Sequence, residues 1–281
     1  MSFELIPDVG ADPRNARTLS RACELAYLPA AEGAAAFKEQ LGFDAELTSV
    51  CSTQVYLAQS AEHVVVAFRG SESPTSIDGL KDWLLTNAVN LLVLPSGAIG
   101  TDFAAAGVGA KFHLGFMTAL ADVWPTLFPK IEAATQQGDR CLWVTGHSLG
   151  GALALLAAWR LQRQFIDVHR VYTFGAPMVG NAVAAEAFQR EFAGRIFRYV
   201  NFEDLVPRLP TVSLLSNDYA HCNQEMGVGP GGPESLAGAL ASLAAEAIDG
   251  LFNHNLMDKL WAQVQTRLTA HDIANYRNVI S

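Results

Sequence analysis

A serine framed by two glycines is the first residue of this chain whose surroundings point to chemistry. Ser148 lies in the pentapeptide 146–150 (Gly-His-Ser-Leu-Gly), between the apolar run 141–144 and a nearly uncharged stretch. In a G-x-S-x-G turn, a strand passes sharply into a helix and the serine hydroxyl projects above the sheet. The pattern predicts a nucleophilic Ser148. The alternative is a glycine-rich turn that contains a serine by chance.

The segments around this turn alternate between two patterns. Continuous apolar, largely β-branched runs predict strands buried on both faces. Strands that alternate with helices predict an α/β fold with a mostly parallel central sheet and helices on both faces, whose ligands bind at the carboxyl ends of the strands. The expected strands are 63–68, 141–145, 171–174 and 196–200, and the expected helices are 15–28, 116–136, 149–164 and 181–192. The glycine-rich stretch 227–232 suggests a loop, and 235–248 suggests a surface helix.

Length and composition limit the function classes. A chain of 281 residues that is 50% hydrophobic and 17% charged is expected to form one domain, 1–281. Its net charge of -9, without a Lys/Arg cluster, argues against a nucleic-acid partner. No uncharged apolar run approaches the ~20 residues of a membrane span. The four cysteines are widely spaced, with no C-x-x-C pair, which argues against a zinc or dithiol site.

The first residues bear on localisation. Glu4 and Asp8 stand where a secretory signal would carry a basic and then an apolar segment. The chain as given is therefore expected to be cytoplasmic. The alternative is a secreted mature form from which a leader has been removed.

Six blocks in a fixed order give the chain a family resemblance. It resembles the class 3 lipases, the α/β-hydrolases typified by the triacylglycerol lipases of filamentous fungi, from about residue 15 to residue 276. One block alone would be weak, but six in the right order are specific. The blocks are 68–71 (FRGS), 82–84 (DWL), 113–116 (HLGF), 146–152 (GHSLGGA), 173–181 (TFGAP with VGN) and 201–210 (NFEDLVPRLP).

The resemblance implies a catalytic acid and a base. The acid is the aspartate of the last block, Asp204, with Glu203 as its local rival. In this fold the histidine follows the acid along the chain, which leaves His221, His254 and His271. His221 resembles a block that is not catalytic. His271, with a tyrosine five residues later on the same expected short helix, is favoured over His254.

The resemblance also implies an oxyanion hole and a lid. Two backbone N–H groups are expected to converge on the developing negative charge, from Leu149 and from Ser71, whose hydroxyl also donates. A candidate lid covers 72–85, and its apolar side chains share one helical face. A fixed helix that buries the same face against the sheet is the alternative. The lid and substrate-binding residues are Ile77, Leu80, Trp83 and Leu84.

These expectations together describe a serine ester hydrolase for lipid esters at an oil–water interface. The resemblance favours a triacylglycerol lipase that forms an acyl-enzyme on Ser148 and needs no metal or organic cofactor. Phospholipase A1 and short-chain carboxylesterase share the same three catalytic residues and remain alternatives. A non-catalytic lipase-like interaction module is the alternative from another class of protein.

Overall fold

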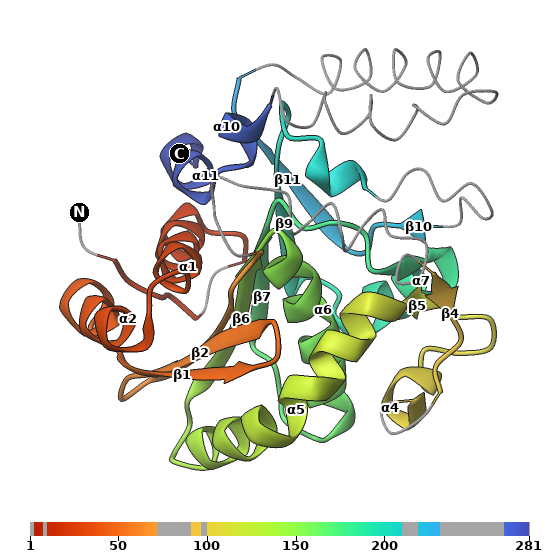
Figure 1. Cartoon of the computed structure of the whole chain (residues 1–281), viewed down its shortest axis with the longest axis horizontal. Helices are drawn as coiled ribbons and strands as arrows, with labels where there is room; N and C mark the ends of the chain where they lie inside the picture. Colours follow the sequence, from red (N-terminus) through yellow and green to blue (C-terminus); the bar gives the residue numbers. More distant parts are fainter. Residues whose placement is uncertain are drawn as a thin grey trace.

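A seven-stranded sheet lies at the centre of the protein, as the computed structural model shows (Figure 1). The structure describes residues 3–7, 10–71, 91–96, 100–209, 219–230 and 267–280. The lid segment 72–85, His254 and the segment 235–248 lie outside the described residues. The strands of this sheet are β1 Asp44–Val50, β2 Thr53–Gln59, β3 His63–Phe68, β6 Cys141–His147, β7 Arg170–Phe174, β9 Ile196–Asn201 and β11 Gln224–Val228.

The strand order is β1-β2-β3-β6-β7-β9-β11. β2 runs antiparallel to both of its neighbours, β1 and β3, whereas the strands from β3 to β11 run parallel to one another. The expected mostly parallel sheet is therefore confirmed. A second, smaller sheet beside it contains β4 Leu92–Val93, β5 Phe112–His113, β8 Gly180–Asn181 and β10 Tyr219–Ala220.

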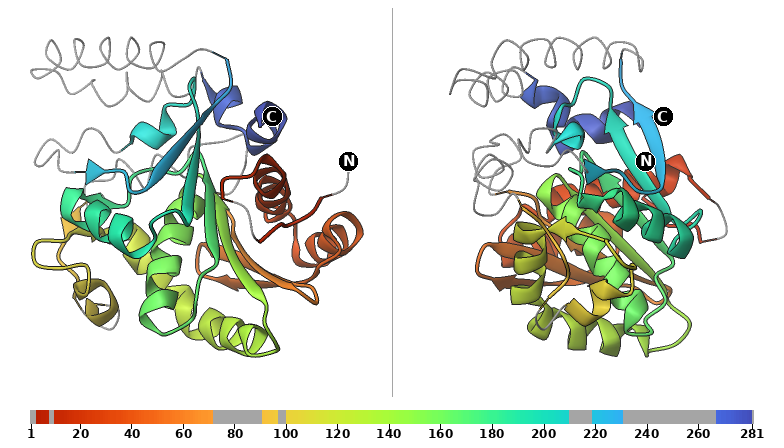
Figure 2. Two further views of the ribbon diagram at one scale, coloured as in Figure 1. Left: turned by 180° about the vertical axis from the view of Figure 1, so that it is seen from behind. Right: turned by 90° about the vertical axis from the view of Figure 1, so that its right-hand side faces the viewer.

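Helices cover both faces of the central sheet (Figure 2). In β3, Val64 and Val66 pack into one core and Val65 and Ala67 into the other, because successive side chains of a strand point to opposite faces. That arrangement explains the continuous apolar run. One face carries α1 Pro13–Leu25, α2 Ala30–Ala36, the adjoining π-helical turn Phe37–Leu41 and α11 Ile273–Val279; the other carries α5 Leu114–Thr135, α6 Leu149–Arg163 and α7 Ala182–Glu191.

The remaining described helices are short: α4 Gly100–Ala104, the 3-10 turn Val206–Arg208 and α10 Leu268–His271. Helix α6 is buried along almost its whole length, since it lies against the sheet, and this burial accounts for its nearly uncharged sequence. No helix within the described ranges is long and apolar enough to cross a membrane.

The sequence-based expectation missed several elements, among them three strands of the central sheet and the four short strands of the second sheet. Strands β1, β2 and β11 were not predicted, and β11 includes Gly227, which had been assigned to a loop. β1 and β11 lie at the two edges of the sheet and expose many side chains, so their sequences lack a continuous apolar run. Helix α1 begins two residues earlier than expected, at Pro13, because Asp12 caps it by accepting a hydrogen bond from the N–H of Arg14.

Candidate active site

Ser148 occupies a sharp turn between β6 and α6. Its backbone has φ 57° and ψ -129°, a conformation that costs a non-glycine residue ~1–3 kcal/mol. The N–H of Ser148 donates to the carbonyl of Phe174 at 2.9 Å, which ties the turn to the end of the neighbouring strand β7. The surrounding structure therefore holds this strained residue in place at the carboxyl end of the sheet.

The two glycines of the pentapeptide are required by close backbone packing. A Cβ atom on Gly146 would lie 2.1 Å from the carbonyl oxygen of Gly150. A Cβ atom on Gly150 would lie 2.3 Å from the carbonyl oxygen of Phe68, on the adjacent strand β3. Real Cβ atoms do not approach backbone oxygens this closely, so side chains at either position would force the turn apart.

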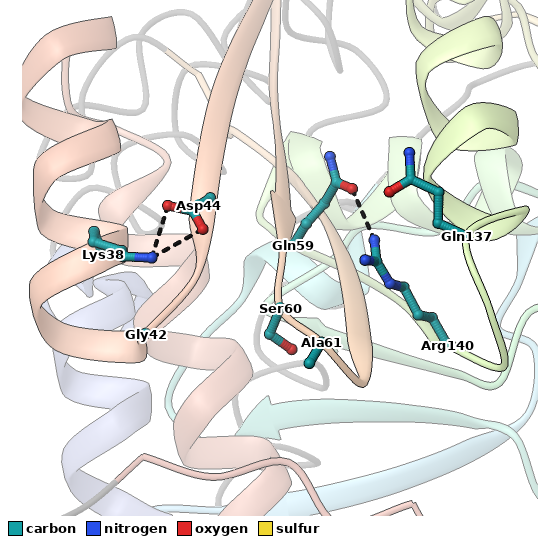
Figure 3. Close-up of a pocket in the computed structure, with 8 residues that line it drawn as sticks. All are labelled: Lys38, Gly42, Asp44, Gln59, Ser60, Ala61, Gln137 and Arg140. Atoms are coloured by element: carbon teal, nitrogen blue, oxygen red, sulfur yellow. Dashed lines mark hydrogen bonds and ion pairs between the residues drawn. The ribbon is translucent and has the colours of Figure 1, made fainter.

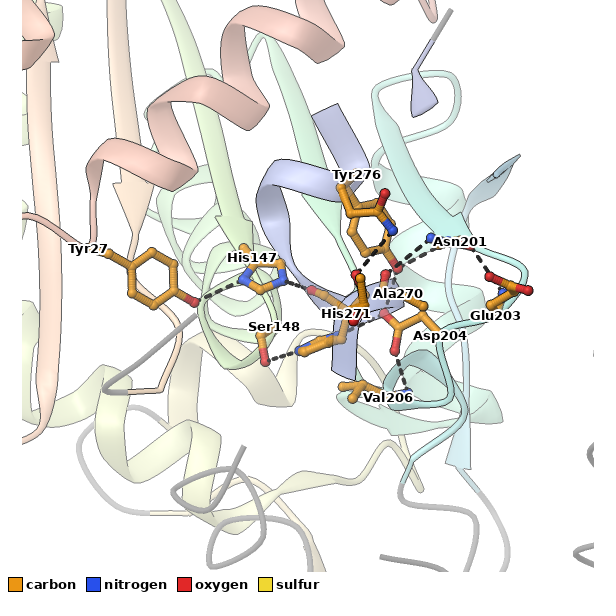
Figure 4. Close-up of polar contacts among 12 residues, drawn as sticks. Tyr27, His147, Ser148, Asn201, Glu203, Asp204, Val206, Ala270, His271 and Tyr276 are labelled. Carbon is orange, nitrogen blue, oxygen red and sulfur yellow. Dashed lines mark hydrogen bonds and ion pairs between the residues drawn. The ribbon is translucent and has the colours of Figure 1, made fainter. Parts of the chain in front are cut away.

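The structure brings Ser148, His271 and Asp204 into one hydrogen-bonded row (Figure 4). Nε2 of His271 lies 2.9 Å from Oγ of Ser148, and its Nδ1 lies 2.8 Å from Oδ2 of Asp204. A carboxylate only accepts hydrogen bonds, so Nδ1 carries the proton and Nε2 is left to accept from the serine hydroxyl. All three side chains are buried, with at most 3% of each exposed.

Asp204 is held by groups on both of its oxygens. The N–H of Val206 donates to Oδ1 at 2.9 Å, and the hydroxyl of Tyr276 donates to Oδ2 at 2.6 Å. Burial, together with the neighbouring carboxylate of Asp204, raises the pKa of Tyr276 well above its usual range, so its hydroxyl remains a donor. The neighbouring side chain of Glu203 points away from His271 (Figure 4).

Tyr276 is not on the same helix as His271, contrary to the expectation from the sequence. Helix α10 ends at His271, and α11 begins at Ile273 after Asp272, which caps it through the N–H of Ala274. Because the two helices are separate, the His271 side chain contacts Ser148 and the Tyr276 hydroxyl contacts Asp204. The contact between Tyr276 and Asp204 was not predicted, because the spacing of two distant segments carries no signal of it.

Leu149 follows Ser148 directly, and Ser71 follows a glycine that packs against the serine turn. Leu149 is the first residue of α6, and the first N–H groups of a helix lack an intrahelical acceptor. Ser71 follows Gly70, where a Cβ atom would lie 3.3 Å from Cβ of Ser148. The backbone at 70–71 therefore runs directly beside the nucleophile turn. Arg69, just before it, donates to the Gln54 side chain on β2, consistent with a structural role.

The side chain of His147 points away from that of Ser148, its neighbour in the turn. Its ring contacts the hydroxyl of Tyr27 and the backbone carbonyl of His271 (Figure 4). His221 lies elsewhere, with Nε2 against the carbonyl of Pro207. The structure therefore places His271, and neither of these two histidines, at the serine; the third candidate from the sequence, His254, is outside the described residues.

A separate hollow of about 460 Å³ lies at the opposite end of the sheet (Figure 3). Lys38 forms an ion pair there with Asp44, and Arg140 donates to Gln59. The hollow adjoins the amino ends of β3 and β6, whereas Ser148 follows the carboxyl end of β6. Among the described residues there is no group of three or more His, Cys, Asp or Glu side chains arranged to hold a metal ion.

The comparison with known proteins identifies the family. Residues 65–214 match the sequence profile described as "Lipase (class 3)". The chain belongs to the class 3 lipase family. The matched region covers more than half of the chain and includes Ser148 and Asp204. The resemblance on which the sequence analysis relied is thus confirmed.

Similar proteins support the family and the fold. A secreted mono- and diacylglycerol lipase A of Penicillium cyclopium is 30% identical over 188 residues, 66% of this chain and 55% of that protein. A chloroplastic phospholipase A(1), DAD1, of Arabidopsis thaliana is 27% identical over 160 residues, 54% of this chain and 34% of that protein. The structure of the Lip2 lipase of Yarrowia lipolytica superimposes with a TM-score of 0.60 at 23% identity, over 80% of this chain and 83% of that one.

The chain therefore has the α/β-hydrolase fold, as expected from the sequence. The matches span only part of each curated relative: 55% of the Penicillium cyclopium protein and 34% of the Arabidopsis thaliana protein.

Proposed function

We propose that this class 3 lipase is a serine ester hydrolase that cleaves lipid carboxylic esters, with acylglycerols as its substrate class and triacylglycerol as the leading candidate. The observation that carries the proposal is the row of hydrogen bonds from Ser148 through His271 to Asp204. This arrangement lets a neutral imidazole take the serine proton while a buried carboxylate steadies the resulting cation.

Acylation follows from the positions of these three side chains. His271 Nε2 removes the proton from Ser148 as its Oγ attacks the ester carbonyl, and the imidazolium then returns that proton to the leaving alcohol. Asp204 stays ionised and accepts the Nδ1–H of His271 throughout. In deacylation, His271 takes a proton from water, the hydroxide attacks the acyl carbonyl, and Ser148 recovers its proton as the carboxylic acid leaves.

The negative charge that develops on the carbonyl oxygen needs donors that are already in place. We assign this role to the N–H of Leu149, at the start of α6, and to the N–H of Ser71, which follows the glycine that packs against the serine turn. Removing one such donor costs about 10²–10³ in kcat in well-studied hydrolases. The first position lies at the start of a buried helix and the second follows a closely packed glycine, so little reorganisation is required during the reaction.

The decisive experiment compares substrates of different classes. Purified wild type and Ser148→Ala are tested on p-nitrophenyl esters of several chain lengths, an emulsified triglyceride and a phospholipid. The proposal expects wild type to hydrolyse the triglyceride and the long-chain esters, and the Ala variant to lose turnover while keeping its fold by circular dichroism. A wild type that is inactive on every ester, or a fully active Ser148→Ala, would contradict it.

Phospholipase A1 activity is the second candidate, and one observation favours it: a relative carries that name. Both activities use the same catalytic residues, so only the substrate panel separates them. Release of fatty acid from the phospholipid at a higher kcat/KM than from the triglyceride would select the phospholipase. The relative from Penicillium cyclopium is named as secreted, which supports the secreted mature form over a cytoplasmic enzyme.

A further inference from the structure

Two buried side chains outside the proposed catalytic row form hydrogen bonds to the backbone that carries His271. The side-chain amide of Asn201 donates to the carbonyl of Ala270 at 3.2 Å, and Nε2 of His147 lies 2.7 Å from the carbonyl of His271 (Figure 4). Asn201 is fully buried and His147 is 1% exposed. Two consecutive peptide groups are therefore fixed from two different strands, β9 and β6.

The contact of His147 fixes its tautomer. A backbone carbonyl only accepts hydrogen bonds, so Nε2 of His147 must carry the proton. Nδ1 is then an acceptor, and the hydroxyl of Tyr27, 2.9 Å away, is its donor. Burial, followed by the neighbouring His271, holds the pKa of His147 well below its usual value, so the ring stays neutral while it makes both contacts.

Tyr27 extends this contact chain to the other side of the site. Its hydroxyl packs against the backbone of Gly70, the residue that precedes Ser71. The approach is close, since a Cβ atom on Gly70 would lie 2.2 Å from the Tyr27 oxygen. Tyr27, two residues after the end of helix α1, thus contacts both the backbone beside the nucleophile turn and the ring of His147.

These backbone contacts are needed because the chain alone does not bring His271 to Ser148. Ser148 and His271 are 123 residues apart, and the chain between β11 and α10 is long. The side-chain contacts of His271 with Ser148 and Asp204 set the direction of its ring, but the location of its backbone depends on other contacts. Misplacement of a catalytic group by ~1 Å can cost about 10²-fold in rate.

We propose that His147 and Asn201 are positioning residues that hold the backbone of Ala270 and His271 in the place where the imidazole reaches both Ser148 and Asp204. Tyr27 supports His147 by occupying its Nδ1. The inference rests on the proposed function, since it assigns these residues a role through His271. None of the three is required to touch the substrate.

The test compares variants of His147 with a matched control. His147→Met keeps most of the side-chain volume and removes both ring contacts, and His147→Gln restores a terminal amide donor. The control is His169→Met, because His169 also places Nε2 against a backbone carbonyl, that of Pro7 at 3.0 Å, but lies at the amino end of β7. For each protein, kcat and KM on a soluble p-nitrophenyl ester and the Tm are measured.

We expect His147→Met to lower kcat by about 10- to 100-fold with KM within about twofold of wild type. The substitution displaces the imidazole of His271, which slows the chemical step and leaves substrate binding unchanged. His147→Gln should recover part of the loss, and His169→Met should change only the Tm. Tyr27→Phe should lower kcat less than His147→Met. Should His147→Met fail to fold, Tyr27→Phe decides, since it removes a single oxygen; a kcat equal to that of wild type in this variant overturns the role of the contact chain.

Asn201 has its own test. Asn201→Asp keeps the acceptor Oδ1, which takes the N–H of Glu203 at 3.1 Å, and removes the donor to Ala270. A fall in kcat with unchanged KM is expected, and an unchanged kcat overturns its role.

Two further measurements separate this inference from the proposed function. A fluorophosphonate probe should label Ser148 in wild type and label His147→Met more slowly, in proportion to the lost kcat. A wild type that neither labels nor hydrolyses esters overturns the proposed function and with it this inference, whereas an active wild type with unaffected variants overturns only the positioning role. In wild type, ¹⁵N spectra should also show His147 as the Nε2–H tautomer without titration from about pH 5 to 8; titration in that range contradicts the contact chain itself.

Discussion

The hydroxyl of Tyr276 lies 2.6 Å from Oδ2 of Asp204, the same oxygen that accepts the ring N–H of His271. That hydroxyl also accepts the backbone N–H of Asn201 at 3.1 Å, so it donates one hydrogen bond and accepts another. Oδ2 therefore accepts from a neutral hydroxyl as well as from the ring of His271, and the additional contact fixes the direction of the carboxylate.

The first prediction concerns this contact. Tyr276→Phe leaves the Asp204 carboxylate and the Asn201 N–H each without one partner, which should lower the free energy of unfolding by about 1.5–3 kcal/mol. The proposed role of Asp204 predicts a kcat reduced on the order of tenfold. The control is Tyr172→Phe, whose hydroxyl donates to the Gly10 carbonyl away from the site, and it should reduce stability alone. Equal kcat values in both variants would argue against the orienting contact.

The second prediction concerns Gly175, which has φ +62° beside the acid and the base. A Cβ atom there would lie 2.9 Å from Oδ2 of Asp204 and 3.1 Å from the ring of His271. Gly175→Ala should therefore reduce kcat strongly, in addition to the ~1 kcal/mol or more of backbone strain. Gly194→Ala is the matched control, because Gly194 has φ +71° with nothing within 4 Å. It should lose stability and keep full activity.

The third prediction uses the strain at Ser148. Ser148→Ala and Ser148→Gly should both be inactive, but only glycine adopts a φ of 57° without steric cost. We expect the Gly variant to be more stable than the Ala variant by ~1 kcal/mol. Urea unfolding of the two proteins measures the difference. A Gly variant that is less stable than the Ala variant would show that the turn stores no strain.

The fourth prediction is a pH dependence of stability. Burial lowers the pKa of His113 to about 3, whereas an unfolded histidine titrates near ~6.5. Between these values the unfolded state binds a proton that the folded state does not. Stability is therefore lost as pH falls below ~6.5, by up to ~1.4 kcal/mol per pH unit for this residue.

His113→Asn isolates this effect. Nδ1 of His113 caps helix α5 by accepting the N–H of Phe116 at 3.3 Å, and an asparagine oxygen can make the same contact without titrating. Between about pH 4 and 6, the slope of unfolding free energy against pH should be shallower in this variant, by close to one proton. An identical slope in both proteins would show that His113 is not held neutral in the fold.

The fifth prediction concerns the candidate lid 72–85, which lies outside the described residues and stays a prediction. If it opens at an interface, full burial of Ile77, Trp83 and Leu84 stabilises the open form by ~1.5–3 kcal/mol for each side chain. The hydrolysis rate should then rise abruptly above the solubility limit of the substrate. Trp83 emission should change with it in a variant without the other four tryptophans. Hyperbolic kinetics through that limit with constant emission would mean a fixed cover.

The sequence by itself determined the local parts of this protein. The turn at Ser148 was predictable because its requirements, two glycines between a buried strand and a buried helix, lie within a few residues. The parallel strands β3, β6, β7 and β9 were predictable because burial on both faces leaves a continuous apolar run. Edge strands β1 and β11 expose many side chains, so the same signal was missing from them.

Only the tertiary structure decided how distant segments meet. It placed His271 at Ser148 and brought Tyr27, Asn201 and Tyr276 into contact around them. These contacts join residues that are far apart in the chain, and local periodicity carries no information about which of them will pair. The partner of a buried donor is set by the packing of helices and strands into one core, because an unpaired polar group there costs ~1–3 kcal/mol.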